Sequence, residues 1–176
     1  MNKIIWPLCA MMLVGCSNIT PSENAAGGHP IVLEKFFTGE LKAHGVILGF
    51  GGKVKRSFNA VMHGEWREEE GVLKGVLTEK FIFDDGEKLE RRWDFTSVGD
   101  GRFEGTASDV EGTAKLETSG NALRMDYALL VPVSGRTISV QVEDWLWLMT
   151  PDILVNKSTM RKWGFKVGEI ITTIVR

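Results

Sequence analysis

Cysteine is scarce in this sequence, with two among 176 residues, Cys9 and Cys16. Because both lie within the first sixteen positions, the rest of the chain must fold without a disulfide bond. Histidine is also scarce, and no spacing of histidine and cysteine fits a metal site. No Gly-x-Ser-x-Gly motif of a hydrolase nucleophile occurs. We therefore expect no catalytic activity, no metal and no cofactor.

A strong charge imbalance is also missing. The 21 basic and 23 acidic residues give a formal net charge of −2 and form no basic stripe, which argues against nucleic acid as a partner. No apolar run reaches the roughly 20 residues that a transmembrane helix needs. The apolar stretch over residues 4–14 has the length expected within a signal peptide, and Lys3 precedes it.

The end of that stretch carries a recognisable motif. Leu13-Val14-Gly15-Cys16 resembles the lipobox of bacterial lipoproteins, in which the signal peptide is cut before the cysteine and the cysteine is lipidated. The resemblance implies a signal peptide over residues 1–15 and lipidation of Cys16. Ser17, in place of the aspartate that retains lipoproteins at the inner membrane, favours the periplasmic face of the outer membrane. The alternative is a buried N-terminal strand.

Two further segments follow. Residues 16–30 are small and polar, which predicts a flexible tether after the lipidated cysteine. Residues 31–176 have the length of a single domain. From Phe36 onward, apolar and polar residues alternate with period two, and glycine-containing turns recur about every ten residues. This pattern predicts an all-β protein.

Turn chemistry predicts which residues face one another across neighbouring strands. A two-residue turn at Glu70-Gly71 places Phe58 opposite Phe83 and Trp66 opposite Gly75. Later turns extend the same inner face through these pairs: Glu79–Arg91, Trp93–Ala107, Arg91–Asp109, Ala107–Leu116, Leu116–Leu123, Tyr127–Val142 and Met125–Asp144. We expect an antiparallel up-and-down barrel of about eight to ten strands, because closure removes exposed edges. A β-sandwich is the alternative.

Several short motifs resemble one family. They are Phe36-Phe37-Thr38-Gly39-Glu40-Leu41, Gly120-Asn121-Ala122, Val131-Pro132-Val133, Asp144-Trp145-Leu146-Trp147-Leu148, Leu154-Val155-Asn156 and Met160-Arg161-Lys162-Trp163-Gly164. Together they look like the bacterial lipoprotein family known as domain of unknown function 3833. The resemblance covers nearly all of the chain after Cys16 and implies a lipocalin-like barrel on a lipid anchor. It implies no particular activity.

The predicted inner face carries charges as well as aromatic rings. The hairpin pairings bring Glu79, Arg91 and Asp109 side by side, and buried charges are costly unless they are paired. One interpretation is an internal ion-pair network that fixes the register of the strands. A second is that Arg91 binds the carboxylate or phosphate head group of a ligand in a cavity. A third is that these charges face solvent.

Asp144 lies between apolar residues of its strand, where burial should raise its pKa unless a neighbour supports the charge. A hydrogen bond to the backbone or to Asn156 is the structural alternative. The predicted ligand-binding residues are Arg91, Glu79, Asp109, Trp93, Trp66, Phe81, Tyr127 and Asp144.

Trp145 and Trp147 point away from Asp144, towards the outer face. They either pack beneath the N-terminal segment or the final hairpin, or contact a membrane or a partner. The sequence thus favours a membrane-anchored lipoprotein whose barrel binds a small apolar or acyl ligand. The alternative is a structural or interaction lipoprotein of the envelope with a filled barrel.

Overall fold

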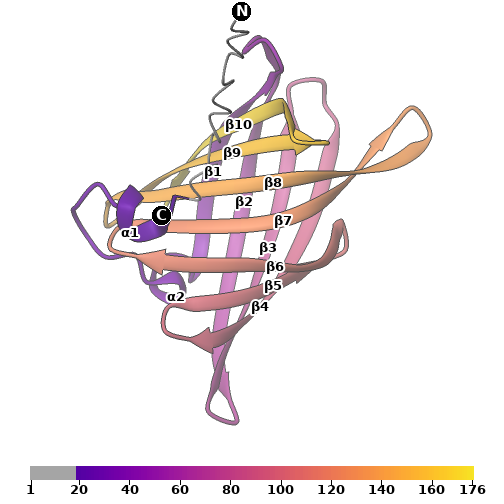
Figure 1. The fold of residues 1–176 in the computed structure, drawn as a ribbon. Helices are drawn as coiled ribbons and strands as arrows, with labels where there is room; N and C mark the ends of the chain where they lie inside the picture. Colours follow the sequence, from indigo (N-terminus) through magenta and orange to yellow (C-terminus); the bar gives the residue numbers. More distant parts are fainter. Residues whose placement is uncertain (1–18) are drawn as a thin grey trace, which may run out of the picture.

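The computed structural model describes residues 19–176 (Figure 1). The predicted signal peptide and Cys16 lie outside the described residues. The helices are α1 (Pro21–Asn24) and α2 (Leu33–Phe36). The strands are β1 (Gly39–Gly49), β2 (Val54–Glu69), β3 (Val72–Phe83), β4 (Lys88–Gly99), β5 (Arg102–Ala107), β6 (Val110–Ser119), β7 (Ala122–Val133), β8 (Arg136–Thr150), β9 (Ile153–Lys162) and β10 (Phe165–Val175).

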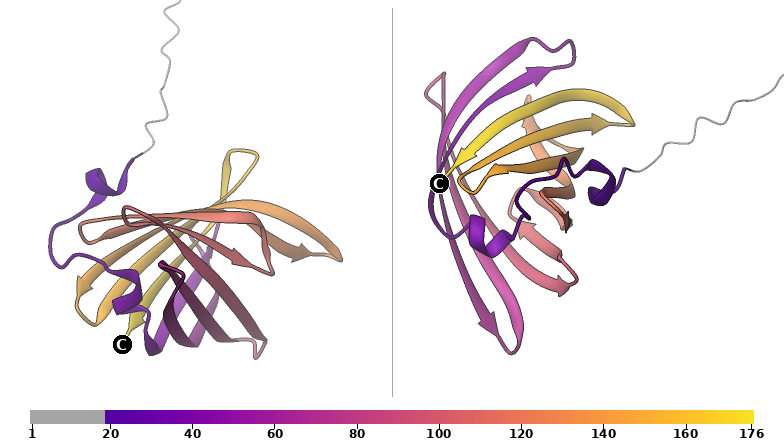
Figure 2. Two further views of the ribbon diagram at one scale, coloured as in Figure 1. Left: turned by 90° about the horizontal axis from the view of Figure 1, so that it is seen from below. Right: turned by 90° about the vertical axis from the view of Figure 1, so that its left-hand side faces the viewer.

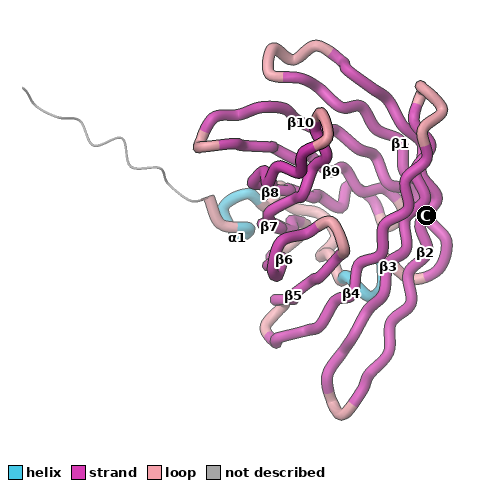
Figure 3. Tube along the Cα trace, turned by 90° about the vertical axis from the view of Figure 1, so that its right-hand side faces the viewer, coloured by secondary structure: helices cyan, strands magenta, loops and turns pink. Residues whose placement is uncertain are grey.

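The ten strands form one closed antiparallel barrel in chain order, and β1 pairs with β10 to complete it (Figures 1 and 3). The prediction of an all-β barrel is therefore confirmed, and the alternative of a sandwich is wrong. Glu70-Gly71 and Ser134-Gly135 both have positive φ at each turn residue. Such two-residue turns match the twist of the adjoining strands and fix their register.

The register follows the turns. The predicted pairs Phe58–Phe83, Trp66–Gly75 and Glu79–Arg91 are observed, as are those between β7 and β8. The predicted pairs around β6 are wrong: Leu116 lies opposite Phe103 on β5 and opposite Met125 on β7.

The error around β6 has a local cause. The turns are Ser108-Asp109, three positions before the suggested Glu111-Gly112, and Gly120-Asn121, one position after the suggested Ser119-Gly120. Gly112, with φ of 74°, lies in a stretch of β6 where the register with β7 shifts. A glycine within an irregular strand has the same sequence signature as a turn glycine. Since the register errors are even numbers of residues, the inner face is unchanged.

Glycines make room for aromatic rings inside the barrel. A Cβ atom at Gly75 would lie 2.5 Å from the ring of Trp66, so only glycine allows the two to face each other. Trp66 and Phe95 stack with ring centroids 6.1 Å apart, and Trp93 continues the row at 5.7 Å from Phe95. This row of rings forms much of the core.

The short helix α2 packs into the barrel interior, where Leu33 and Phe36 join the core. The indole Nε1 of Trp66 donates a hydrogen bond to the carbonyl of Phe37, at 3.1 Å. A Cβ atom at Gly64 would lie 1.6 Å from that same carbonyl oxygen. The backbone after α2 thus rests directly on β2 at a position that only glycine permits.

The segment before α2 crosses the outside of the barrel (Figure 2). Trp145 and Trp147 stack with centroids 6.2 Å apart, and the Trp147 Nε1 donates to the carbonyl of Asn24 at 3.1 Å. Arg124 donates to the carbonyl of Ile19 at 2.8 Å. Two more attachments are Ala26 N–H to Asn121 Oδ1 and Ile31 N–H to the Gly120 carbonyl.

These contacts resolve the two interpretations of the tryptophan pair, which packs beneath the N-terminal segment. They also differ from the flexible tether expected over residues 16–30. From Ile19 onward the segment is held by hydrogen bonds to β6–β8 and their turns.

Candidate functional site in the barrel interior

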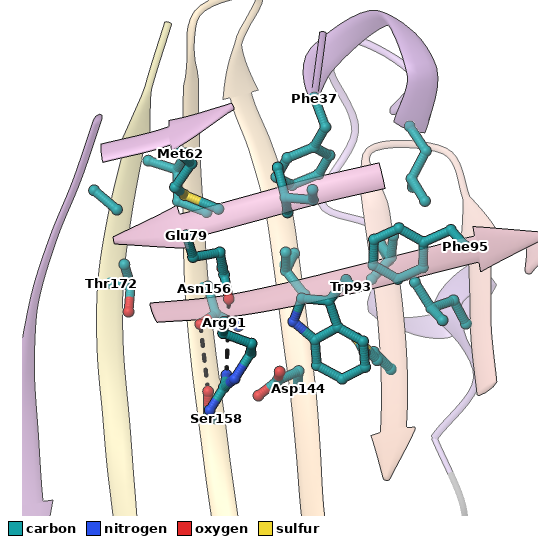
Figure 4. A pocket seen from close by; sticks show the side chains of 18 of the residues that line it. Phe37, Met62, Glu79, Arg91, Trp93, Phe95, Asp144, Asn156, Ser158 and Thr172 are labelled. Carbon is teal, nitrogen blue, oxygen red and sulfur yellow. Dashed lines mark hydrogen bonds and ion pairs between the residues drawn. The ribbon is translucent and has the colours of Figure 1, made fainter. Parts of the chain in front are cut away.

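The barrel interior contains a partly open cavity of about 150 Å³ (Figure 4). Its wall is made by α2 and by inward-facing side chains of most strands. The lining residues are Leu33, Phe37, Ala43, Phe58, Met62, Trp66, Leu77, Glu79, Phe81, Arg91, Trp93, Phe95, Leu116, Leu123, Met125, Tyr127, Asp144, Leu146, Asn156, Ser158, Ile170, Thr172 and Ile174. A small number of polar groups in a mainly apolar wall is typical of a ligand site.

The structure brings together the residues that the sequence predicted. Seven of the predicted ligand-binding residues line the cavity: Arg91, Glu79, Trp93, Trp66, Phe81, Tyr127 and Asp144. Asp109 is not part of the wall but contacts Arg91 from the β5–β6 turn. The third interpretation of the charges, that they face solvent, is wrong. That these residues bind a ligand stays a prediction.

Arg91 on β4 is the only cation of the wall. Its guanidinium lies 2.7 Å from Asp109 Oδ2 through Nη2, and its Nε donates to the same oxygen at 2.9 Å. Glu79 on β3 lies on its other side, with 3.8 Å between Arg91 Nη1 and Glu79 Oε2. The predicted ion-pair network is therefore present. Asp109 accepts from Nε and Nη2 of Arg91, so a ligand carboxylate would have to bind at the remaining N–H groups, next to Glu79.

Burial changes the pKa values of the acids in the cavity. It raises the pKa of Glu79 to about 7, and the nearby Arg91 charge offsets only part of this effect. Burial likewise raises the pKa of Asp144 to about 6, against the opposing effects of Ser158 and Tyr127. The pKa of Tyr127 is raised as well, first by burial and then by Asp144. Both carboxyl groups therefore titrate in the range from weakly acidic to neutral pH.

Two carboxylate oxygens in the cavity lack hydrogen-bond donors. Within residues 19–176, neither Glu79 Oε2 nor Asp144 Oδ1 has a hydrogen-bond partner, although Glu79 Oε2 lies 3.8 Å from Arg91 Nη1 and the Tyr127 hydroxyl donates to the other Asp144 oxygen at 3.2 Å. A buried acceptor without a donor is costly, and each such group calls for an explanation. Glu79 and Asp109 flank the guanidinium of Arg91 and Asp144 lies in the same cavity wall, so acids outnumber the cation and the site favours a donor or a cation over an anion.

The sequence named Asn156 only as a possible partner of Asp144 and missed the polar wall that Asn156 forms with Ser158 and Thr172. Ser158 on β9 lies across from Asp144 on β8, and its hydroxyl contacts Asn156 Oδ1 at 3.3 Å (Figure 4). Asn156 donates in turn to the carbonyl of Trp145 at 3.3 Å, and Thr172 on β10 completes this wall. Pairing β8 with β9 across the Pro151-Asp152 turn would have predicted that these residues face the cavity. No pattern in the sequence predicted that Leu33 and Phe37 line it.

Other classes of site find no support in the described part of the chain. Between Ile19 and Arg176, no three histidine, cysteine, aspartate or glutamate side chains gather as metal ligands would. The same residues contain no helix that is long and apolar enough to cross a bilayer.

A closed ten-stranded barrel with an internal cavity defines the protein as lipocalin-like. Residues 10–176 match the family described as "Protein of unknown function (DUF3833)", and the chain belongs to that family. No curated protein matches it.

One solved structure with this fold is the S-type phycobiliprotein lyase CPES from Guillardia theta. It is 12% identical, with a TM-score of 0.61 over 83% of this chain and 93% of the lyase chain. At that identity the likeness carries the fold alone.

The expectation that this chain has no catalytic activity is corrected by that comparison. The structural neighbour is a lyase, so a barrel of this architecture does occur in an enzyme. The expectation rested on missing metal, cysteine and nucleophile-elbow motifs. Those motifs belong to other folds and are no measure of what a lipocalin-like interior can do.

Proposed function

We propose that this protein binds a small ligand inside its barrel while a lipid on Cys16 holds it at the periplasmic face of the bacterial outer membrane. In this proposal residues 1–15 are removed as a signal peptide and residues 31–176 form the binding domain. The observation that carries it is the cavity itself, where Glu79 Oε2 and Asp144 Oδ1 lack donors amid aromatic rings.

The volume limits the ligand. An apolar cavity of about 150 Å³ is large enough to bind benzene, so the enclosed part of the ligand is a compact ring or the end of an acyl chain. Trp93 and Phe95 offer flat surfaces for such a group. A whole acyl chain would need more room, which requires α2 to move out of the interior.

The polar groups limit it further. Glu79 and Asp144 present oxygens that accept hydrogen bonds, and the charge of Arg91 is already paired with Asp109. The best match is an apolar group that carries an amine or a hydroxyl, because such a donor satisfies the unpaired oxygens. This differs from the head-group interpretation drawn from the sequence, in which Arg91 grips a carboxylate.

A filled barrel with a purely structural role is the second candidate. It has less support, because a filled interior should leave neither a cavity of this size nor buried acceptors without donors. The outer tryptophan pair that would serve a partner is also covered by the segment around α1.

Three compounds of nearly equal shape test the proposal: benzylamine, benzyl alcohol and benzoate. The full chain, labelled with fluorotryptophan, is titrated with each while the fluorine resonances of Trp66 and Trp93 are followed by NMR. We expect benzylamine to bind most tightly, benzyl alcohol less tightly and benzoate weakest. Resonances of cavity tryptophans separate true binding from partitioning into lipid or detergent.

Variants test whether Asp144 contacts the amine of the ligand. Asp144→Asn should weaken benzylamine binding about tenfold and leave benzyl alcohol nearly unchanged, since a neutral amide loses the charge attraction. Asp94→Asn is the control, because this exposed carboxylate pairs with Arg92 on the outer surface. Tightest binding by benzoate, or no shift of either resonance with any compound, would overturn the proposal. The intact mass of the mature protein tests the lipid on Cys16 separately.

A further inference from the structure

The turn between β9 and β10 has an unfavourable backbone conformation. Trp163 and Gly164 form this turn, and Trp163 has φ of 50° in the left-handed region. That conformation is normally taken by glycine, asparagine or aspartate, and it is strained for a bulky residue. The side chain of Trp163 is also 86% exposed. Neither the turn nor the barrel core requires a tryptophan here, so its presence calls for another explanation.

The residues around the turn share this character. Phe165 is 75% exposed, and Val167 adds further exposed apolar surface. Lys162 and Lys166 flank the rings: the half-buried Lys162 donates from Nζ to the carbonyl of Ser139 and lies 5.4 Å from the centre of the Trp163 ring, and Lys166 is exposed. We call residues 162–167 the β9–β10 tip.

The charge of the β9–β10 tip has one sign, because residues 162–168 contain two lysines and no acid. The next acid, Glu169, pairs with Lys166 at 3.2 Å and with Lys157 at 3.4 Å, so one acid stands against the three lysines Lys157, Lys162 and Lys166 and the net charge there is positive. Aromatic rings flanked by lysines are the combination found at membrane interfaces. The rings enter the head-group region and the cations face anionic lipids.

The position of the tip agrees with this chemistry. Both views of Figure 2 place the β9–β10 tip and α1 on the same side of the barrel, and Figure 3 shows the same arrangement. Ile19, where the described chain begins, is 49% exposed on that side. Cys16 precedes it by three residues, a stretch that spans at most about 10 Å. A bilayer held at Cys16 would therefore lie near the side from which the tip projects.

We propose that the β9–β10 tip inserts Trp163 and Phe165 into the head-group region of a bilayer that contains anionic lipids. Lys162 and Lys166 contact the lipid phosphates. The tip contact itself needs no lipid on Cys16, although the two together would hold the barrel in one orientation on the membrane.

The depth of Trp163 is the first test. The full chain, labelled with fluorotryptophan, is bound to phosphatidylcholine vesicles that contain phosphatidylglycerol and a lipid with a spin label at the head group. We expect the Trp163 resonance, assigned with Trp163→Phe, to broaden strongly. The resonances of Trp66 and Trp93, inside the barrel, should stay narrow. A narrow Trp163 resonance on bound protein would overturn the proposal.

Partitioning of variants is the second test. Trp163→Ser combined with Phe165→Ser should reduce binding to these vesicles at least tenfold. Lys162→Gln and Lys166→Gln should each reduce it about fivefold, and only when phosphatidylglycerol is present. All variants keep the same residues 1–18, so any difference belongs to the tip.

Val98→Ser is the control, since Val98 is 49% exposed next to the β4–β5 turn, at the opposite end of the strands from the β9–β10 tip. Equal losses from Val98→Ser and the tip variants would indicate unspecific apolar binding and overturn the proposal. So would self-association in the absence of vesicles that the tip variants abolish, because the tip would then serve a second copy. Benzylamine binding inside the barrel should be unchanged in every tip variant, which keeps this test separate from that of the ligand.

Discussion

Glu79 and Asp144 are carboxyl groups in a mainly apolar interior, where they lose the hydration that would stabilise their charged forms. Glu79 is buried and Asp144 is half-buried, each has an oxygen without a hydrogen-bond donor among the described residues, and Glu79 shares the cation Arg91 with Asp109. In such surroundings a carboxyl group lowers its cost by taking up a proton. The free energy of unfolding should therefore depend on pH in a direction opposite to that of an ordinary surface acid.

The sign follows from the pKa values. The pKa of Glu79 is raised from 4.5 to about 7 and that of Asp144 from 3.8 to about 6, so the folded state binds more protons than the unfolded state between these limits. Stability from these groups is present at low pH and is lost as pH rises towards 7. Urea unfolding of the wild type should show a fall on the order of 1–3 kcal/mol between pH 5 and pH 8.

Glu79→Gln supplies the comparison for this pH profile. The amide does not titrate, so the fall between pH 5 and pH 8 should be clearly smaller in the variant. The acids with lowered pKa (Glu23, Glu69, Asp85 and Glu169) act below this window and leave it undisturbed. A wild type and a variant with the same slope would show that Glu79 keeps an ordinary pKa in the folded state.

At the scale of elements, the junction of α2 with β2 decides whether the interior is closed. Gly64 lets the Phe37 carbonyl approach, and Trp66 donates a hydrogen bond to it. The four residues of α2 are too few to be stable as an isolated helix, so their position depends on these contacts and on the burial of Leu33 and Phe36.

Gly64→Ala should therefore destabilise the protein by about 2–3 kcal/mol, because the added methyl group collides with backbone that has little freedom to move. Thermal unfolding and urea unfolding both measure this. Gly51→Ala is the control, since that residue has open space around its Cβ position and no positive φ. Equal stability of Gly64→Ala and Gly51→Ala would mean that α2 is not fixed by this contact.

The elements also show what the sequence could predict. Hairpins with a two-residue turn ending in glycine, such as Glu70-Gly71, fix the register, and their pairs were predicted correctly. The pairs of β6 were not, because Gly112 within the strand resembles a turn. The period of two survives such errors, which is why the inner face around Arg91 was found although some neighbours were wrong.

The missing part of the site lies where local signals are weak. Asn156 and Ser158 face the cavity only through the pairing of β8 with β9, and Phe37 reaches it only because α2 folds inward. The volume of the cavity could not be predicted from the sequence either. Whether small residues leave space or merely receive aromatic rings depends on ring positions, as the contact of Trp66 with Gly75 illustrates.

In the molecule as a whole, the length of the pairing between neighbouring strands differs around the barrel. β5 and β6 pair only from Arg102–Glu117 to Gly105–Ala114, whereas β2 and β3 pair from Phe58–Phe83 to Glu69–Val72. A short ladder holds fewer backbone hydrogen bonds and opens at lower cost. The β5–β6 side is the weakest part of the wall around the cavity.

Hydrogen exchange followed by mass spectrometry should detect this unevenness. We expect amides of β5 and β6 to exchange at least tenfold faster than those of β2 and β3 under native conditions. Binding of benzylamine should slow exchange in β4 and β8, which carry Arg91 and Asp144. Uniform exchange around the ring would show that the barrel opens only by unfolding as a whole.

The pairing of β1 with β10 has a consequence for how the protein is made. β1 is among the first strands to emerge during synthesis, yet its second neighbour is the last strand of the barrel. Until β10 arrives, β1 presents an open edge that could pair with another chain. Closure also depends on contacts between distant parts of the sequence, which form slowly. A nascent chain of this kind would benefit from a chaperone that shields the β1 edge until synthesis is complete.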